Sequence, residues 1–240
     1  MVGWVLVAFS ASTFDKHQSG NIKIVMLLNP PGVYRAEHDT GLLIRVMDRG
    51  YAKDRRVLDL GTGGGALAIA AARGGATSVT AVDLSLRSVI ATKLNSWLHR
   101  VSVQVVRGDL LEPVGDRQFD LVVANPPYVP SETATLPRHR KARCWDAGPD
   151  GRELVDRICS GVGDVLAPEG DVLLVHSELT GTERTLEAFA EAGLQARILT
   201  RASIPFGPVL QARAPMLERR GLINPGQRIE NLVVIGARHA

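Results

Sequence analysis

The sequence predicts an α/β fold, with a doubly wound, mostly parallel sheet that is covered by helices on both faces and forms a single domain. Short apolar segments rich in β-branched residues alternate with longer segments of helical spacing. A glycine-rich turn joins the first confident strand to the first confident helix, as in open parallel sheets. With 240 residues, 45% hydrophobic and 22% charged, the chain is long enough to bury one large core.

Strand and helix patterns follow one another regularly along the chain. Six short apolar segments are predicted to be buried strands, at 56–60, 78–82, 101–106, 119–124, 171–176 and 231–236. Helical spacing covers the segments 66–75, 85–100, 151–166 and 182–194. This order indicates βαβ units. The segment 201–230, rich in Pro, Gly and Arg, is predicted to be an insertion before the last strand, with a helix broken at Pro215.

Composition narrows the class of protein. The formal net charge is only +3, too small for a nucleic-acid-binding tail. The two cysteines, Cys144 and Cys159, form no disulfide framework, the six histidines show no metal-ligand spacing, and a cytoplasmic setting without a metal is expected. The apolar start of the chain is too short for a membrane span. We expect residues 1–25 to be a disordered or mis-assigned extension and residues 26–240 to form the domain.

The glycine-rich turn, "VLDLGTGGGALAIAAA", is the strongest local signal. Asp59 ends the strand, and Gly61, Gly63 and Gly65 alternate after it, with Thr62 between the first two. Glycines let the backbone turn tightly and approach a ligand closely, and the start of the following helix offers free N–H groups. A tight turn without a ligand would show the same pattern, but two further acids favour a nucleotide-like cofactor.

Those acids follow the next two strands. Asp83 comes 22 residues after Gly61 (83 − 61 = 22), where an acid in this fold would bind two ribose hydroxyls. Asp109 follows the third strand and could accept a hydrogen bond from an adenine amino group, although a turn or a helix cap would also explain it. We assign Leu84 and Leu110, their neighbours, to the same pocket.

The charge of the loop favours one cofactor. An acid leads the glycines and no phosphate-binding lysine follows them, so a pyrophosphate beside Asp59 would be repelled. S-Adenosylmethionine is instead positively charged at its sulfonium and its amino group. The loop also resembles that of class I methyltransferases.

Asn-Pro-Pro occurs twice, at 29–31 and at 125–127. The first copy precedes every confident strand, and we interpret Asn29 as structural. The second follows the fourth strand, at the edge of the sheet where open α/β folds bind ligands. There Asn125, Pro126, Pro127 and Tyr128 form a stiff loop, because proline fixes its own φ and restricts the residue before it.

This loop suits methylation of a planar NH₂ group. The lone pair of such a nitrogen is delocalised, so the group must be held in line with the methyl donor. The Asn125 side-chain oxygen and the Pro126 carbonyl can each accept one N–H, and Tyr128 can stack on the planar group. A strand-ending turn with an aromatic lid is the alternative interpretation.

The motifs "VLDLGTGGG", "VDLS", "GDLLEP", "DLVVANPPYVP" and "WDAGPDGREL" together resemble HemK-type glutamine methyltransferases, which modify the Gly-Gly-Gln tripeptide of translation release factors. The resemblance covers about residues 30–200. It implies a Rossmann-like class I methyltransferase sheet of seven strands, S-adenosylmethionine as cofactor, Asn125 and Tyr128 on the substrate amide, and Gly61, Asp83 and Asp109 on the cofactor.

The start of the chain departs from the bacterial members, whose separate amino-terminal helical domain has no counterpart here. The stretch "GVYRAEHDTGLLIRVM" instead resembles a short branch of the family in eukaryotes and archaea, where Tyr34, Glu37, Asp39 and Thr40 would cover the methionine end of the cofactor. Thr40 could equally cap the following helix. That branch works with a small zinc-binding activator subunit, which is therefore a candidate partner alongside a protein substrate.

Two alternatives remain from the sequence. An exocyclic amine of adenine or guanine in RNA or DNA could use the same four loop residues, and the basic run 136–143 could steer a nucleic acid or an acidic protein. A solvated loop is the simpler interpretation of that run, which has no interleaved aromatic residues. The other alternative is an inactive interaction module that binds the cofactor.

Overall fold

The computed structural model describes residues 4–5, 27–132 and 144–240. Most of the predicted amino-terminal extension and all of the basic run 136–143 lie outside these ranges. Within the extension, β1 (Trp4–Val5) pairs antiparallel with β2 (Leu27–Leu28).

Seven further strands form one sheet, and they confirm the predicted fold class. They are β3 (Arg56–Leu60), β4 (Ser78–Asp83), β5 (Gln104–Arg107), β6 (Phe119–Ala124), β7 (Leu166–Ser177), β8 (Leu194–Pro205) and β9 (Ile229–His239). The order across the sheet is β5-β4-β3-β6-β7-β9-β8. Strands β3 to β7 are parallel, and β9 runs antiparallel to both of its neighbours. The order reverses between β3 and β6, which is where open sheets of this kind bind ligands.

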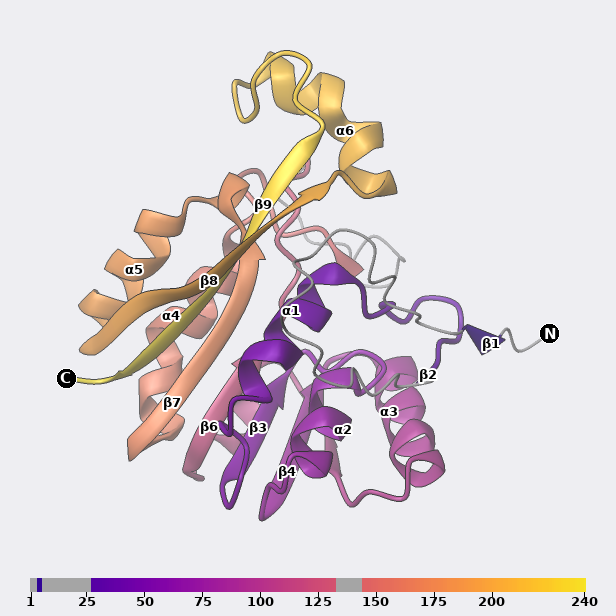
Figure 1. Ribbon diagram of the computed structural model, residues 1–240, viewed down its shortest axis with the longest axis vertical. Coiled ribbons are helices and arrows are strands. Elements are labelled where there is room, and N and C mark those ends of the chain that lie inside the picture. Colours follow the sequence, from indigo (N-terminus) through magenta and orange to yellow (C-terminus); the bar gives the residue numbers. More distant parts are fainter. Residues whose placement is uncertain (1–3, 6–26, 133–143) are drawn as a thin grey trace.

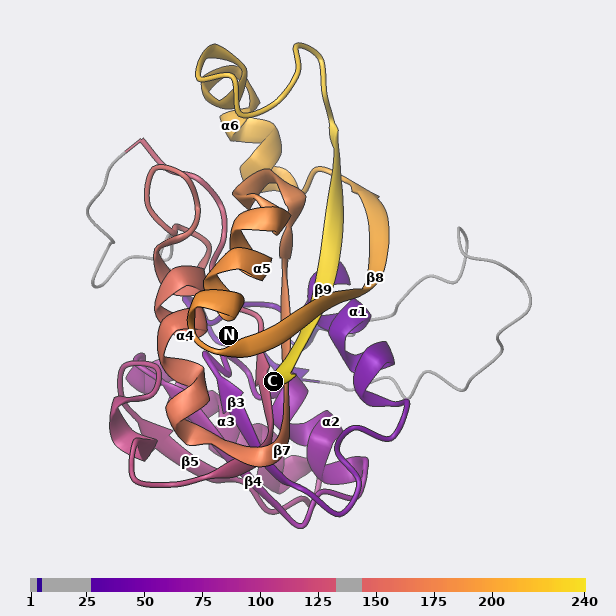
Figure 2. The same ribbon diagram turned by 90° about the vertical axis from the view of Figure 1, so that its left-hand side faces the viewer.

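Helices cover both faces of the sheet (Figure 2). They are α1 (His38–Met47), α2 (Ala66–Arg73), α3 (Leu86–Leu98), α4 (Glu153–Val165), α5 (Thr182–Glu191) and α6 (Pro208–Arg219). One core packs α1 and α2 on one face, and a second core packs α4 and α5 on the other. The central strands are buried on both sides, which explains their nearly continuous apolar sequences.

The region after α5 differs from its prediction. Strand β8 was not predicted, because polar residues alternate along it, as suits a strand at the edge of the sheet. Residues 201–205, the first part of the expected insertion 201–230, therefore belong to β8. The predicted break at Pro215 is wrong as well, since α6 continues through that residue. The helix tolerates the proline because Leu210, Ala214 and Leu217 are buried in its own small core.

Strands β8 and β9 extend beyond the others and hold α6 above the carboxyl edge of the sheet (Figure 1). The small core around α6 includes Val129, which directly follows the second Asn-Pro-Pro-Tyr stretch. The β8–α6–β9 arm thus packs on the loop that the sequence singled out.

Candidate active site

The Asp59 side chain holds the glycine-rich turn in place through hydrogen bonds. Its side chain is fully buried at the end of β3, and its Oδ2 accepts hydrogen bonds from the Thr62 hydroxyl at 2.6 Å and from the Ala68 backbone N–H at 3.0 Å. Its Oδ1 is buried without a hydrogen-bond partner in the described part of the chain. Burial raises the pKa of Asp59 to about 7, although its two hydrogen bonds favour the ionised form.

The glycines after Asp59 are required by the backbone. Gly61, Gly63 and Gly65 all have positive φ, which side chains rarely adopt. A Cβ on Gly65 would also lie 2.9 Å from Thr92 Cγ2, whereas nothing lies within 4 Å of a Cβ on Gly61. The loop is therefore packed on the helix side and open at Gly61, where a ligand can approach the backbone.

Asp83 ends β4 beside this loop. Its carboxylate accepts hydrogen bonds from the backbone N–H groups of Gly63, at 2.9 Å, and Ser85, at 2.8 Å. These hydrogen bonds hold the carboxylate at the end of the second strand, where an acid in this fold would bind ribose hydroxyls. Leu84 is 40% exposed next to it.

Asp109 and Leu110 follow β5, the neighbouring strand. The Asp109 carboxylate forms an ion pair with Arg157 of α4 at 3.0 Å, and Leu110 has a φ of +49°. The Gly108 N–H donates to the Asp83 carbonyl at 3.1 Å, which holds the two strand ends together. Asp109 and Leu110 thus lie at the carboxyl edge of the sheet, one strand beyond Asp83.

The segment that leads into α1 forms a hydrogen-bonded cluster with the second Asn-Pro-Pro-Tyr loop. The buried Asp39 carboxylate accepts from the Tyr34 hydroxyl at 2.7 Å and from the Tyr128 hydroxyl at 3.1 Å. Asn125 Nδ2 donates to the Thr40 hydroxyl at 3.0 Å. Burial, followed by the charge of Asp39, raises the pKa of both tyrosines well above the usual range, so they remain neutral donors.

One cavity joins the three predicted segments. It is lined by Tyr34 and Thr40, by Gly61 and Thr62 of the glycine loop, and by Asn125. The alternative that Thr40 caps the helix is wrong, because α1 begins at His38, two residues earlier, and no side chain caps its start; the Thr40 hydroxyl instead accepts from Asn125. Gly64, Leu27, Ala36, Ala66 and Leu67, which the sequence did not single out, complete the lining.

Asn29, in the first Asn-Pro-Pro copy, follows β2 outside this lining. Its Nδ2 donates to the Leu27 carbonyl at 3.4 Å, and its Oδ1 is buried without a hydrogen-bond partner among the described residues. The nearby β2 is held by Asn95 of α3, whose amide exchanges hydrogen bonds with the Leu28 backbone.

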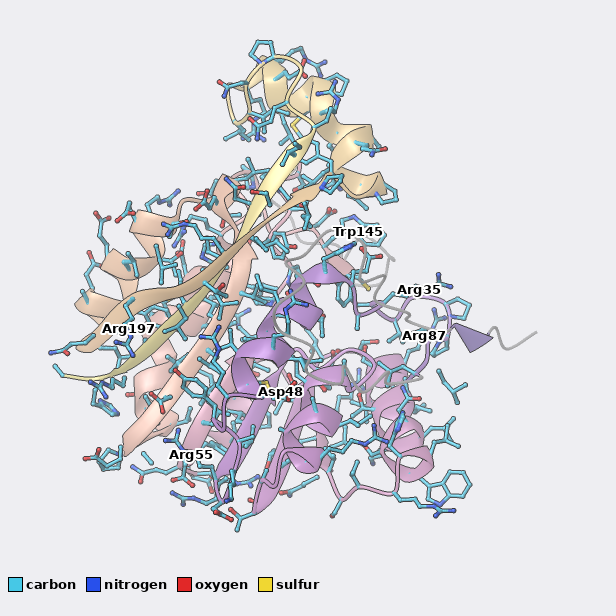
Figure 3. The ribbon with its side chains drawn as sticks, viewed as in Figure 1. Arg35, Asp48, Arg55, Arg87, Trp145 and Arg197 are labelled. Atoms are coloured by element: carbon cyan, nitrogen blue, oxygen red, sulfur yellow. The ribbon has the colours of Figure 1, made fainter. Side chains whose placement is uncertain are left out.

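The stretch 145–151 supports the second loop. Val129 and Asp146 form a parallel bridge, and the Val129 N–H donates to the Trp145 carbonyl at 2.8 Å. A Cβ on Gly151 would lie 2.3 Å from the Tyr128 carbonyl oxygen, so only glycine fits against this backbone. Figure 3 shows Trp145 on the same side of the molecule as Arg35 and Arg87, near the segment that leads into α1.

Two buried ionisable residues near the site were missed by the sequence analysis. Arg152, 1% exposed, donates to the backbone carbonyls of Thr180 and Gly181 and so joins the start of α4 to the turn before α5. Glu230, 5% exposed on β9, lies within electrostatic range of Asp39 and Tyr128. Arg152 lies within the stretch "WDAGPDGREL", but nothing in that stretch shows that its side chain is buried, and no local motif marks Glu230. The surroundings of both residues come from distant parts of the chain.

Sequence comparison decides the family. A family model described as methyltransferase small domain matches residues 24–139. A putative protein N5-glutamine methyltransferase of Methanocaldococcus jannaschii is 32% identical over 186 residues, which is 77% of this chain and 92% of that protein. This chain belongs to the HemK family of glutamine methyltransferases. Methyltransferase HEMK2 of Homo sapiens is 29% identical over 171 residues, 68% of this chain and 80% of that one.

Relatives differ in how much of their length is matched. A release factor glutamine methyltransferase of Geobacter sulfurreducens is 31% identical over 68% of this chain but only 59% of its own length. Among solved structures, the Mtq2–Trm112 complex of E. cuniculi, described as responsible for methylation of the translation termination factor eRF1, includes a chain with a TM-score of 0.62 and 25% identity. The match covers 87% of this chain and 99% of that one.

The methyl donor of this methyltransferase is S-adenosylmethionine, and the structure fits it. The backbone is open at Gly61, the Asp83 carboxylate lies beside the loop, and the electronegative Asp59 Oδ1 is buried at its base without a hydrogen-bond partner among the described residues. These features suit a nucleoside with a cationic sulfur more than a pyrophosphate. In the described ranges, no three His, Cys, Asp or Glu side chains are grouped to hold a metal ion, and no helix is long and apolar enough for a membrane span.

Proposed function

We propose that this enzyme methylates the side-chain amide nitrogen of a protein glutamine, with the Gly-Gly-Gln tripeptide of a translation release factor as its acceptor. The hydrogen-bond arrangement of Asn125 is the main support. Asn125 lines the cavity, its Nδ2 donates to Thr40, and no donor among the described residues is bonded to its Oδ1, which can therefore accept a hydrogen bond from a substrate. An amide NH₂ needs an acceptor at this place, between the cofactor loop and Tyr128.

The chain would act by orientation and electrostatics. S-Adenosylmethionine supplies an electrophilic methyl group. Asn125 Oδ1 and the Pro126 carbonyl would each accept one N–H of the glutamine amide, which directs the nitrogen lone pair at the methyl carbon. The amide nitrogen would form a C–N bond with this methyl group as its C–S bond breaks, the electron pair of that bond would stay on sulfur, and one amide proton would leave to water. Gly61, Thr62, Asp83 and Asp109 would hold the nucleoside, and Tyr34, Asp39 and Thr40 the methionine end.

The acceptor is tested by incubating the protein with methyl-labelled cofactor and either purified release factor or total RNA. We expect label in the release factor, and none when the glutamine of its Gly-Gly-Gln tripeptide is replaced by alanine. Label in RNA alone would show that the acceptor is a base amine.

Asn125→Ala tests the amide contact. The substitution removes the Oδ1 acceptor but leaves the glycine loop and Asp83 intact, so cofactor binding should stay within about threefold. Turnover should fall at least about a hundredfold, as for the loss of one well-placed hydrogen-bond partner of a reacting group. Calorimetry gives the first quantity and label transfer the second, and near-normal turnover would remove Asn125 from the proposed role.

We further propose that a small activator subunit docks on α3, and an apolar stripe supports this. Leu86, Ile90, Leu94 and Trp97 recur at helical spacing and are 53%, 57%, 42% and 73% exposed. Strand β5 beside α3 is an edge of the sheet. Contiguous exposed apolar surface of this kind marks protein interaction sites, and the E. cuniculi relative is a two-protein complex.

Co-expression with a Trm112-type subunit tests this surface. Trp97→Glu should abolish co-purification, because it would remove the most exposed apolar side chain of the stripe and bury a charge in the contact. Ile229→Glu is the matched control, since Ile229 is 57% exposed at the start of β9. Equal loss in both variants, or retention in Trp97→Glu, would argue against docking on α3.

A further inference from the structure

Glu230 brings a buried acid to the carboxyl edge of the sheet, at the start of β9. One carboxylate oxygen is hydrogen-bonded to the Ser177 side chain at the end of β7. The other, Oε2, is buried and has no hydrogen-bond partner among the described residues. Leaving such an oxygen unsatisfied costs free energy, so its retention calls for an explanation.

Glu230 lies within electrostatic range of Asp39, a second buried acid, which is 5% exposed. Neither acid lines the cavity itself, but Asp39 is hydrogen-bonded to Tyr34 and is followed by Thr40, and both of these residues line it. The donors to Asp39 are the two tyrosine hydroxyls and the Thr40 backbone and hydroxyl, all neutral.

No cationic side chain forms an ion pair with Asp39 or Glu230 within residues 27–132 and 144–240. Arg201, on the neighbouring β8, is paired with Glu178 at 2.8 Å. Buried carboxylates are normally paired with a cation or protonated. Two such groups behind residues that line one cavity therefore favour the entry of a positive charge into it.

We propose that Glu230 and Asp39 form an anionic pair that is completed by the sulfonium of the methyl donor. Glu230 is thereby a positioning residue that makes the site prefer the charged donor to S-adenosylhomocysteine, the neutral product left after transfer. The preference depends on the cofactor and not on the acceptor, so it can fail or succeed independently of the proposed glutamine substrate.

The protonation of Glu230 sets the range of pH in which this preference changes. Burial raises the pKa of Glu230 to about 7, the Ser177 hydrogen bond opposes this, and the charges of Asp39 and Glu37 add to it. Tyr128 stays neutral, and His38 and Arg35 lie near Glu37. Below pH 7 the carboxyl is mostly neutral. Above pH 7, or with the sulfonium bound, it is ionised.

The test is equilibrium binding of S-adenosylmethionine and S-adenosylhomocysteine to the full chain between pH 6.0 and 7.5. If the sulfonium lowers the pKa of Glu230 by one unit, the ratio of the two dissociation constants should change by about fourfold in favour of the donor as pH rises. Glu230→Gln should remove most of this pH-dependent change in the ratio. A smaller change should remain, because Asp59, whose pKa is also about 7, titrates in the same range. Glu169→Gln, an exposed acid on β7, is the matched control and should behave as wild type.

Proton release by the wild type gives a second measurement that does not depend on a variant's folding. Calorimetry at pH 6.5 in buffers of different ionisation enthalpy should show about half a proton more released on binding the donor than the product. Equal release for the two ligands, or an unchanged ratio in Glu230→Gln, would overturn the proposal and leave Glu230 a structural acid.

Discussion

Asp59 shows how one residue can serve both the fold and the site. It lies at the end of β3, where it fastens the turn through Thr62 and the start of α2 through Ala68. The same burial that makes these hydrogen bonds effective makes its charge costly. Its position was predictable from the "VLDLG" pattern, but its raised pKa was not, because burial of the side chain depends on the whole sheet.

Asp59→Asn should stabilise the protein increasingly as pH rises. The pKa of Asp59 is raised from 3.8 to about 7 in the folded state, so the stability that its neutral form provides is lost as pH rises through 4 to 7. Asparagine is neutral throughout and keeps the same shape. The difference in unfolding free energy between variant and wild type should grow by about 2 kcal/mol from pH 5 to pH 7.5.

Urea denaturation at the two pH values measures this difference. Glu230 and His176, whose pKa values are about 7 and about 4, also titrate in or near this range. They are the same in both proteins, so their effects cancel in the comparison. A difference that does not depend on pH would mean that Asp59 is ionised without penalty.

Other residues of the site were predictable to different degrees. Asn125 and Tyr128 could be singled out because they follow a strand that the apolar pattern identifies, and a strand end places them at the carboxyl edge. Glu230 directly precedes the predicted strand 231–236 and lies at the start of β9, but its electrostatic coupling to Asp39 depends on β9 inserting beside β7. That pairing is decided by tertiary structure rather than by any local pattern.

At the scale of elements, the 145–151 stretch explains why the Asn-Pro-Pro-Tyr loop keeps one shape. The loop continues into Val129, Pro130 and Ser131, whose backbones bond to Trp145, to Arg213 of α6 and to Gly148. Arg220 of α6 also donates to the Ser131 carbonyl at 3.1 Å. The stiffness that two prolines give is thus reinforced from both sides.

Gly151→Ala should displace Tyr128. The new Cβ would meet the Tyr128 carbonyl oxygen at 2.3 Å and Thr180 Cγ2 at 2.8 Å, which requires the backbone to move. We expect a loss of stability of about 2–4 kcal/mol and a fall in methyl transfer of at least about tenfold, with cofactor affinity changed much less.

Gly226→Ala is the control, because Gly226 has nearly the same φ, +77° against +76°, but no atom within 4 Å of a Cβ. The Gly226→Ala variant has the backbone strain of a positive φ without the clash. Its free energy of unfolding should therefore fall by about 1 kcal/mol, and its activity should be unchanged. Thermal melts and label transfer compare the two variants. Equal effects would show that φ, and not contact with Tyr128, makes glycine necessary at 151.

At the scale of the molecule, the sequence pattern was sufficient for the central part of the sheet and insufficient for its antiparallel edge. Strands β3, β4 and β6 are buried on both faces, and their apolar segments were unambiguous. Among the described strands, β8 pairs with β9 alone, and it has exposed positions, so its apolar pattern is interrupted. The arm around α6 has a core of its own, which is too small to give a signal along the chain.

Replacement of residues 207–227 by a short Gly-Ser turn should separate cofactor binding, which should be kept, from methyl transfer, which should not. The two large cores do not include α6, so the sheet should fold and cofactor affinity should stay within about threefold. Methyl transfer should be lost, because Arg213 and Arg220 no longer hold the backbone of residues 130 and 131. Calorimetry and label transfer test both expectations, and retained transfer would mean that the loop is stable without the arm.

The place of β9 between β7 and β8 determines an order of assembly. The chain contains β8 before β9, yet among the described strands β9 alone pairs with it. Until β9 is in place, β8 has an unpaired backbone of the kind that invites aggregation. The exposed Gln195, Arg197 and Arg201, which interrupt the apolar pattern of this strand, are residues of the kind that oppose such association.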